Sequence, residues 1–483
     1  MRLASVAMLF IALLLPGSAG AKELLSAAVI ETYLDEKNPY VYTAVAQQYV
    51  SQARAEAAEG GFDTRLGVKY DNKRYPASEG ELADVYVEKA TESGLEFLLG
   101  YRRAEGVQEY SNIKTGDEGE VRMGVKIPVF AVAKGMNARR YTLEAASIDA
   151  VQSTYVSKEN LRHLRFDVYA AYYTLLSSRE VLTLESALLE KARQRERFIR
   201  SKVSVGELPE IALLELQRQI LSREQRRLEA DNAYTVALGN FARFLGLSRG
   251  ALEARYELPP LPDAVPKQIA LETALQDAWQ QRPDLKSLQY EKTRFGLQEE
   301  YNAVSKYPRL NVALYGVHDF VYDNGVKVSV EMKFPIERRT YAGRKKEIQK
   351  GVRAVDEALQ RRRIEIETAL SNRFATREML RANLQKASEE VSLAEKLEAA
   401  EVKKYRLGAG DLVLVNRREL TTLEVRQKQL SYQLRLLLLG LEIERELGAS
   451  VASTSPNHTR RSTLPRDHGQ RPERFFAGRG SRV

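Results

Sequence analysis

Three stretches of the chain alternate strictly between apolar and polar residues, with the period of a β-strand that buries one face. In the first stretch, Leu66, Val68 and Tyr70 share one face, while charged residues and a glycine occupy the other. The same alternation recurs in two later stretches, and a fourth run follows it less regularly. The pattern predicts strands at residues 62–71, 120–130, 309–316 and 325–336.

Two shorter apolar runs, Val85 to Lys89 and Leu95 to Arg102, occur only in the first half of the chain. Their pattern is compatible with two further strands of the same sheet, and also with a hairpin that lies outside it. The sequence leaves both arrangements open.

Each half of the chain also contains a stretch of nearly 70 residues without proline, at 137–205 and 341–407. Leu, Ala, Glu, Arg and Lys dominate both stretches, so their helix propensity is high. The apolar stripe is narrow, as at Leu164, Val168 and Tyr172, and a helix of this length would extend for about 100 Å. The pattern therefore predicts coiled coils or an extended bundle, because no single globular core is that long.

The two halves repeat one plan, which indicates a tandem duplication. The proline that ends a strand at Pro128 recurs 207 residues later as Pro335, and the closing glycine Gly246 recurs 202 residues later as Gly448. Each half is expected to open with a helix, from about Leu24 to Glu59 in the first half and from Lys267 in the second.

A Gly-acidic-Leu turn joins each long helix to a shorter one, as Gly206-Glu207-Leu208 and, 204 residues later, as Gly410-Asp411-Leu412. Glycine allows the backbone to reverse, and Glu207 and Asp411 occupy positions where an acidic cap or first-turn residue is favoured. The candidate site residues of these two tips are Val205, Gly206, Glu207, Leu208, Tyr405, Leu407, Gly408, Gly410, Asp411 and Leu412.

Residues 1–21 combine Arg2, a short apolar run and small residues, which is typical of a secretory signal peptide. An uncleaved membrane anchor is the alternative, but the run is shorter than the ~20 residues that a spanning helix needs. The remaining segments are predicted to be a first repeat at 22–255 that closes with a helix at 209–248, a Pro-rich linker at 256–266, a second repeat at 267–448 that closes with a helix at 411–447, and a disordered basic tail at 449–483.

Charge and composition exclude several classes of function. The formal charge of +9 falls to +3 once Arg2 and the basic tail are set aside, so no folded face is expected to bind nucleic acid. Cysteine is absent, which excludes thiolate metal sites and thiol nucleophiles. His163 and His318 have no partners of a catalytic constellation nearby in the sequence, and Gly408-Ala409-Gly410 lacks the third glycine of a dinucleotide site. We expect no enzyme activity, no metal and no cofactor.

The alternating strands fit two environments, because a water-soluble sheet with one buried face alternates in the same way as a membrane barrel. Each run is close to the ~9–11 residues with which a tilted strand crosses a bilayer. Aromatic residues such as Tyr70, Tyr75, Tyr307 and Tyr315 flank the runs, as in outer-membrane barrels. Together with the predicted signal peptide and the lack of a later apolar stretch of spanning length, these features favour the barrel.

In this order, and duplicated, the elements resemble the TolC-like outer-membrane efflux channel family, also called outer membrane factors, over roughly residues 22–448. The motifs that carry the resemblance are Arg282-Pro283-Asp284-Leu285, Tyr307-Pro308-Arg309-Leu310, the strand-to-helix passages at Pro128 and Pro335, and the tip from Tyr405 to Leu412.

The resemblance implies a mainly α fold with a transmembrane β portion. Three identical chains would form an outer-membrane β-barrel that is continuous with a periplasmic α-helical barrel. The implied function is the passive exit channel of a tripartite efflux or type I secretion system. Its partners would be a periplasmic adaptor (membrane-fusion) protein that docks at the helical tips, an inner-membrane pump and outer-membrane lipid. Oligomerisation fits the strands, because the open sheet edges of a single chain cannot face lipid.

Tips of this family commonly carry acidic residues one turn beyond the second Gly-Asp-Leu, where Leu414 and Arg417 stand in this chain, followed by Arg418. The gate candidates are therefore Asp411, Leu414, Arg417 and Arg418. If Arg417 faces the channel axis, three copies would form a cationic constriction that favours anions. Two alternative functions are a periplasmic coiled-coil adaptor, which would lack the duplicated strand–helix unit, and a soluble extracellular coiled-coil structural protein.

Overall fold

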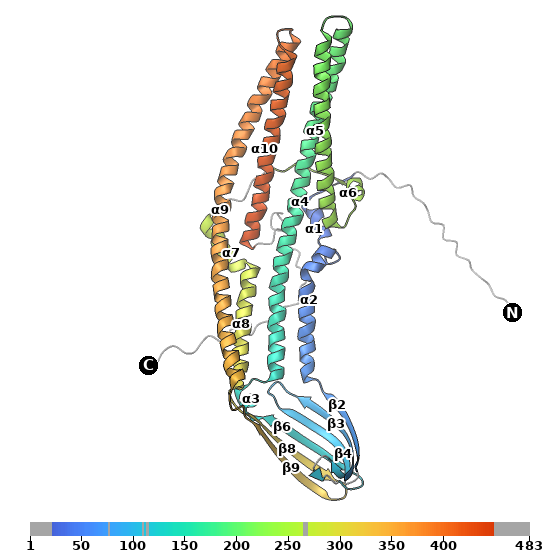
Figure 1. Ribbon diagram of the computed structural model, residues 1–483, viewed down its shortest axis with the longest axis vertical. Helices are drawn as coiled ribbons and strands as arrows, with labels where there is room; N and C mark the ends of the chain where they lie inside the picture. The colour runs from blue at the N-terminus through green and yellow to red at the C-terminus, as the bar shows by residue number, and fades with distance from the viewer. Residues whose placement is uncertain (1–21, 76–77, 109–110, 113–114, 264–268, 449–483) are drawn as a thin grey trace, which may run out of the picture.

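The computed structural model describes residues 22–75, 78–108, 111–112, 115–263 and 269–448. The predicted signal peptide and the predicted basic tail lie outside these residues. The molecule is elongated, with a β-sheet at one end (Figure 1). Long helices extend away from the sheet to the other end, where two short turns connect them to returning helices. Within the described ranges, no helix has both the length and the apolar character that crossing a membrane requires.

Two helices run through most of the molecule, α4 (Ala138–Ser204) and α9 (Arg339–Arg406), with 67 and 68 residues. At 1.5 Å per residue, each extends for about 100 Å. Two shorter helices, α5 (Glu210–Ala242) and α10 (Leu412–Leu447), return along them. The result is two long helical hairpins, α4–α5 and α9–α10, each with one turn at the tip of the molecule (Figure 1).

The single opening helix predicted from Leu24 to Glu59 is wrong, because the structure has two helices there. They are α1 (Ala27–Tyr33) and α2 (Pro39–Glu59). The break falls at Asn38, whose ψ of 124° is extended, because a residue that precedes proline is disfavoured in the helical conformation.

The second repeat opens with the same break. Its helices are α7 (Leu271–Gln281) and α8 (Pro283–Val304), and Arg282 between them has a ψ of 125°. Proline at the first position of α8 needs no backbone donor there, so it starts the helix without cost.

Short elements complete the helical part. The predicted linker at 256–266 begins with a strand, β7 (Tyr256–Glu257), which pairs in parallel with β1 (Glu23–Leu24). Residues 264–266 of that linker lie outside the described residues. The other short elements are η1 (Gly60–Phe62), α3 (Val129–Lys134), η2 (Arg243–Leu245) and α6 (Arg249–Arg255).

The sheet has one continuous path of six antiparallel strands, in the order β2-β3-β4-β6-β8-β9. The strands are β2 (Arg65–Tyr75), β3 (Ser78–Ala90), β4 (Glu96–Gln108), β6 (Glu120–Pro128), β8 (Arg309–Asp319) and β9 (Asp323–Lys333), and β5 (Ser111–Asn112) pairs with the end of β4.

The two runs whose place the sequence left open are therefore β3 and β4, and they lie within the sheet between β2 and β6. The first repeat contributes four strands to the continuous path and the second repeat contributes two. Contacts at the helical end of the sheet hold this inserted hairpin. Asn137 Nδ2 donates a hydrogen bond of 2.9 Å to the carbonyl oxygen of Glu92, and Arg139 forms an ion pair of 2.6 Å with Glu96.

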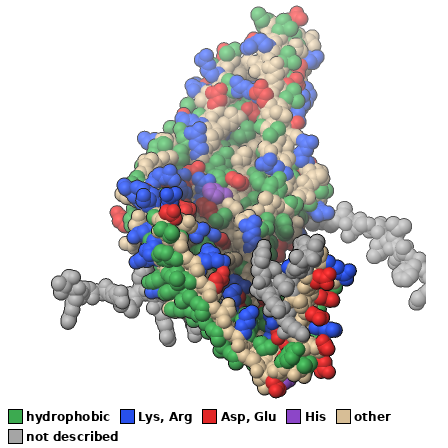
Figure 2. All heavy atoms as spheres, turned by 60° about the horizontal axis from the view of Figure 1, so that its bottom comes forward, with side chains coloured by type: hydrophobic (Ala, Val, Ile, Leu, Met, Phe, Trp, Pro, Cys, Tyr) green, Lys and Arg blue, Asp and Glu red, His purple; other side chains and the backbone are tan. Residues whose placement is uncertain are grey.

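The register places a row of apolar residues from every strand on the same face of the sheet. Leu66 lies opposite Val87, Val87 opposite Leu99, and Leu99 opposite Met123. These side chains are exposed, up to 71% for Leu66. Figure 2 shows a band of hydrophobic side chains at the sheet end of the molecule, with a group of Lys and Arg side chains just beyond it.

The opposite face of the sheet carries charges that pair across strands. Arg122 forms an ion pair with Asp84, and Arg102 forms one with Glu120. An exposed apolar face of this size is rare on soluble monomers. The two faces therefore suit two different environments, one apolar and one aqueous.

Candidate functional site at the helical tips

Both tips are built by the same backbone motif at the end of a long helix. In the first tip, Gly206 has φ +76° and its N–H donates to the carbonyl oxygen of Val203, while Glu207 N–H donates to that of Lys202. This is the Schellman motif, in which a left-handed residue satisfies the last carbonyl groups of the helix. A side chain at Gly206 would strain the turn, because left-handed φ is costly for residues with a Cβ atom.

The second tip repeats the motif at Gly408, which also has φ +76°. Gly408 N–H donates to the carbonyl oxygen of Tyr405, and Ala409 N–H donates to that of Lys404. The structural counterpart of Gly206 is thus Gly408, 202 residues later. The sequence alignment of Gly206 with Gly410 was wrong by two residues.

The shorter helices of the two hairpins begin at equivalent positions with different caps. Asp411 is the N-cap of α10, and its Oδ1 accepts a hydrogen bond of 3.0 Å from Val413 N–H. The N-cap of α5 is Pro209, which has no capping side chain. Glu207 lies two residues before this N-cap and does not cap the helix. Its carboxylate instead forms an ion pair of 3.2 Å with Lys202. The prediction of an acidic cap is therefore confirmed for Asp411 and wrong for Glu207.

Replacing Asp411 with alanine is expected to destabilise the first turn of α10 by about 1 kcal/mol, because one backbone donor loses its partner. Hydrogen exchange at the amides of residues 412–414 should become faster by several-fold. Glu207→Ala is the matched control at the other tip, since Glu207 caps no helix, and exchange in α5 should stay unchanged. Equal effects of the two substitutions would contradict this assignment.

The apolar side chains at the tips form a packed group and an exposed group, and Val413 in the exposed group was not among the predicted site residues. Leu208, Tyr405 and Leu412 pack against a hydrophobic cluster of α4 and α5 that includes Ile199 and Leu216. The exposed apolar group comprises Val205, Leu407, Val413 and Leu414, which are 68, 74, 54 and 41% exposed. Both hairpins therefore end in apolar side chains that project into solvent.

A buried charge cluster joins the two hairpins below the tips. Glu419 on α10 is only 3% exposed. It forms an ion pair with Arg195 on α4 and a second one, of 3.2 Å, with Arg223 on α5. Arg195 also donates a hydrogen bond of 2.6 Å to Asn416 Oδ1, and Arg223 donates one of 3.1 Å to the carbonyl oxygen of Leu188.

The two arginines keep Glu419 ionised although it is buried. Burial alone would raise the pKa of Glu419, but the hydrogen bond from Arg195 and the charges of Arg195 and Arg223 lower it below its ordinary value. Breaking a buried pair on one side is costly, because the remaining charge stays unpaired in a poorly solvated site. The cluster therefore fixes the α9–α10 hairpin against the α4–α5 hairpin.

Sequence reasoning missed this cluster, although a signal was present. Glu419 lies four residues after Val415 and four before Leu423, and all three are buried on one stripe of α10. A charged residue at an apolar stripe position is uncommon, because buried charges need partners.

The gate candidates occupy the exposed side of the same region. Asp411, Leu414 and Arg417 are exposed and Arg418 is half-buried. A groove of about 760 Å³ lies between α4 and the α9–α10 hairpin, and Arg195, Glu398 and Glu419 are among its lining residues. Among the residues that the structure describes, no group of three or more His, Asp or Glu side chains is placed to hold a metal ion.

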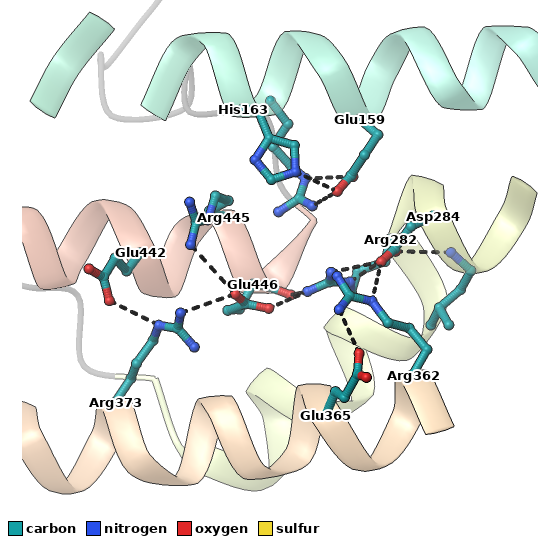
Figure 3. Close-up of polar contacts among 12 residues, drawn as sticks. Glu159, His163, Arg282, Asp284, Arg362, Glu365, Arg373, Glu442, Arg445 and Glu446 are labelled. Atoms are coloured by element: carbon teal, nitrogen blue, oxygen red, sulfur yellow. Dashed lines mark hydrogen bonds and ion pairs between the residues drawn. The ribbon is translucent and has the colours of Figure 1, made fainter. Parts of the chain in front are cut away.

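A second charge cluster surrounds the Arg282-Pro283-Asp284 motif at the start of α8 (Figure 3). Arg282 is 1% exposed and forms ion pairs with Asp284, at 2.8 Å, and with Glu446 on α10. Arg362 on α9 pairs with Asp284 at 2.7 Å, and Arg373 on α9 pairs with Glu446 at 3.3 Å. The motif therefore joins α8, α9 and α10.

These arginines hold Asp284 in its charged form. Burial would raise the pKa of Asp284, but the hydrogen bonds and charges of Arg282 and Arg362 lower it far below its usual range.

The first repeat has a simpler contact at the position that corresponds to Arg282. Arg282 Nη1 donates a hydrogen bond of 3.1 Å to the carbonyl oxygen of Glu446, and Asn38 Nδ2 donates one of 2.7 Å to that of Phe244. The two acceptors are 202 residues apart, and each lies two residues before the glycine that ends its helix. In both repeats, the residue before proline thus caps the end of the returning helix.

Solved structures of outer-membrane proteins resemble this chain over most of its length. The outer membrane protein VceC from Vibrio cholerae matches with a TM-score of 0.64 and 14% identity, covering 87% of this chain and 96% of that one. The CmeC outer membrane channel from Campylobacter jejuni matches with a TM-score of 0.64 and 13% identity, covering 87% and 85%. The MtrE outer membrane channel from Neisseria gonorrhoeae, in its open state, matches with a TM-score of 0.63 and 13% identity, covering 87% and 88%.

A scan against protein-family models found no match. A sequence search of curated proteins likewise found none. The similarity is therefore one of three-dimensional structure alone, and it covers 85–96% of each chain compared. The predicted resemblance to TolC-like channels is confirmed at the level of the fold: this chain has the fold of the outer-membrane channel proteins.

Proposed function

We propose that three copies of this chain form the outer-membrane exit channel of a tripartite efflux or type I secretion system. The observation that carries the proposal is the sheet, in which each of the six strands contributes apolar residues to one face, while charges pair on the other. Such strands suit a barrel wall with lipid outside and water inside. The likeness to structures described as outer-membrane channels supports the same setting.

The continuity between sheet and helices supports a conduit. Strand β6 leads through α3 into α4, and β9 leads into α9, so the sheet wall and the long hairpins form one body (Figure 1). Three copies of the two hairpins would surround a tunnel about 100 Å long. Transport would be passive in this chain, with energy supplied by an inner-membrane pump.

The exposed apolar residues of the tips are the proposed docking site for a periplasmic adaptor. Val205 and Leu407 flank the two Schellman glycines and project into solvent. Apolar side chains at the end of a helical hairpin suit a partner that packs end-on against both helices. We propose that adaptor contact there shifts the hairpins from a closed to an open arrangement, with the Glu419 cluster holding the closed one.

Arg417 is proposed to face the channel axis and favour anions. Single-channel recordings should show an anion preference that Arg417→Ala weakens. Lys428→Ala is a control with the same charge change further along α10, where Lys428 pairs with Glu390 at 2.9 Å, and it should leave selectivity unchanged. Strong cation selectivity that Arg417→Ala does not alter would rule this out.

Membrane fractionation tests the proposed function directly. The chain should float with outer membranes, require detergent for extraction and elute as a trimer. Incorporation of the purified protein into planar bilayers should produce ion conductance. Recovery in the soluble periplasm as a monomer that is stable without detergent would favour an adaptor or a structural coiled-coil protein.

A further inference from the structure

The two outermost strands of the sheet, β2 and β9, each pair with a neighbouring strand on one side. Strands β2 and β9 are each eleven residues long, and neither has a second partner in the part of the chain that is described. All residues of β9 are exposed, including Val326 and Val328 at 76 and 64%. Neither strand contains proline, which commonly blocks pairing at sheet edges. Two long edge strands of this kind leave backbone N–H and C=O groups free to pair with a further strand.

We propose that β2 of a second copy of this chain pairs with β9, with Leu66 opposite Met332, and that three copies thereby close a barrel of eighteen strands. The inference rests on the proposed function for its membrane setting and for the number of copies. A second copy is the matching occupant because β2 leads away from the helices and β9 leads back to them. In a ring of identical chains, the two edges are therefore antiparallel.

The register within the sheet determines which residues meet. One row of opposed residues starts at Leu66, near the helical end of β2, and reaches Val326, near the far end of β9. The next copy of β2 begins beside the helical end of β9 when its Leu66 lies opposite Met332. This position is six residues further along β9 than Val326.

This offset produces a strand tilt that is typical of barrels. Six residues for each copy amount to eighteen for three copies, which equals the number of strands. With ~3.3 Å per residue and ~4.8 Å between strands, the tilt is about 35°. Membrane barrels have tilts of about 35–45°.

The same register matches the side chains on both faces of the wall. Tyr70 comes to lie opposite Val328 on the apolar face, where aromatic and β-branched residues pair favourably. Asp71 comes to lie opposite Lys327 on the polar face, which places unlike charges together.

The inserted β3–β4 hairpin determines the width of the channel. Eighteen strands at this tilt give a backbone diameter of about 35 Å, compared with about 23 Å for the twelve strands that remain without the hairpin. Barrels of 16–18 strands leave an aqueous channel. We infer that the hairpin supplies one third of the barrel wall and roughly doubles its cross-section.

Engineered disulfides test the pairing between copies. The chain has no cysteine, so the introduced thiols are the only ones. Leu66→Cys combined with Met332→Cys should produce covalent dimers and trimers on oxidation of the detergent-purified protein, because opposed residues lie within disulfide reach. Leu66→Cys with Val330→Cys or with Phe334→Cys tests registers shifted by two residues. More efficient cross-linking of either would overturn the proposed register.

Two pairs within one chain test the strand count. Leu66→Cys with Val87→Cys should form a disulfide, since these residues are opposed. Leu66→Cys with Met123→Cys should not, because two intervening strands separate them by about 14 Å, beyond the ~7 Å limit for bridged Cα atoms. A Leu66–Met123 disulfide would mean that β2 pairs directly with β6, and the eighteen-stranded barrel would be wrong.

The outcomes separate this inference from the proposed function. A conducting outer-membrane channel without the Leu66–Met332 cross-link would overturn the inference and leave the proposed function standing. A chain that is monomeric in detergent-free buffer would overturn both.

Discussion

Replacing Arg282 with alanine is expected to destabilise the protein by about 3–5 kcal/mol, because a buried ion pair then loses one partner. Arg282 is almost fully buried between Asp284 and Glu446, and both carboxylates are themselves poorly exposed. Its removal leaves two negative charges near each other without their shared partner. It also frees the carbonyl oxygen of Glu446 at the end of α10.

Denaturant unfolding in detergent, followed by the loss of trimers on size-exclusion chromatography, measures this effect. Lys292→Ala is the matched control, because its ion pair with Asp356 is about half exposed and exposed pairs contribute about 0–1 kcal/mol. Asn38→Ala should have a smaller effect than Arg282→Ala, since Asn38 is neutral and leaves no unpaired charge. A stable trimer of Arg282→Ala would show that the cluster does not support the fold.

Replacing Glu419 with alanine is expected to open the tips. Arg195 and Arg223 then remain close together without the carboxylate between them, and the α9–α10 hairpin loses its buried link to α4 and α5. A loss of about 3 kcal/mol changes the ratio of open to closed tips by a factor on the order of 100. Because Glu419 lies below the tip and far from the sheet, the fold of the sheet should persist.

Conductance in planar bilayers measures the effect: it should rise strongly for Glu419→Ala in the absence of an adaptor. Glu424→Ala is the control, because Glu424 is an exposed residue on the same helix. Conductance of Glu419→Ala that equals that of the unmodified protein would exclude the cluster as the closing element.

The helical part of this fold was accessible from the sequence because its pattern is long and repeated. The absence of proline over nearly 70 residues located α4 and α9 to within two residues at each end. The break at Asn38 was missed, although proline follows it directly, because an apolar pattern continues on both sides.

The place of strands β3 and β4 was left open because their two runs occur only in the first half of the chain. In β3, Tyr86 also interrupts the alternation between Val85 and Val87. Tyr86 lies on the face of β3 that also carries Asp84 and Glu88. There it covers two glycines of the neighbouring strands, since a Cβ atom at Gly67 would lie 2.4 Å from its ring and one at Gly100 would lie 2.7 Å from its Cβ. A large ring beside two glycines is one packing unit in the sheet, but in the sequence it resembles a loss of pattern.

At the second tip, the sequence does not show which of two glycines ends the long helix. Gly408 and Gly410 stand two residues apart, and only the backbone angle reveals that Gly408 ends the helix. Gly410 is required for another reason, because a Cβ atom there would lie 2.7 Å from the backbone nitrogen of Tyr405. The position of Glu419 on the apolar stripe was a signal, but its partner could not be found from the sequence because Arg195 is 224 residues away.

The two tips share one backbone but differ in chemistry, since Pro209 begins the returning helix in one and Asp411 begins it in the other. A ring of three chains would present six outwardly similar turns of two alternating kinds. A partner that contacts the ring at six places with identical subunits would have to tolerate both surfaces, whereas a partner that contacts it at three places could recognise one kind alone. How strictly such a partner distinguishes proline from aspartate would therefore determine how many copies of it the ring binds.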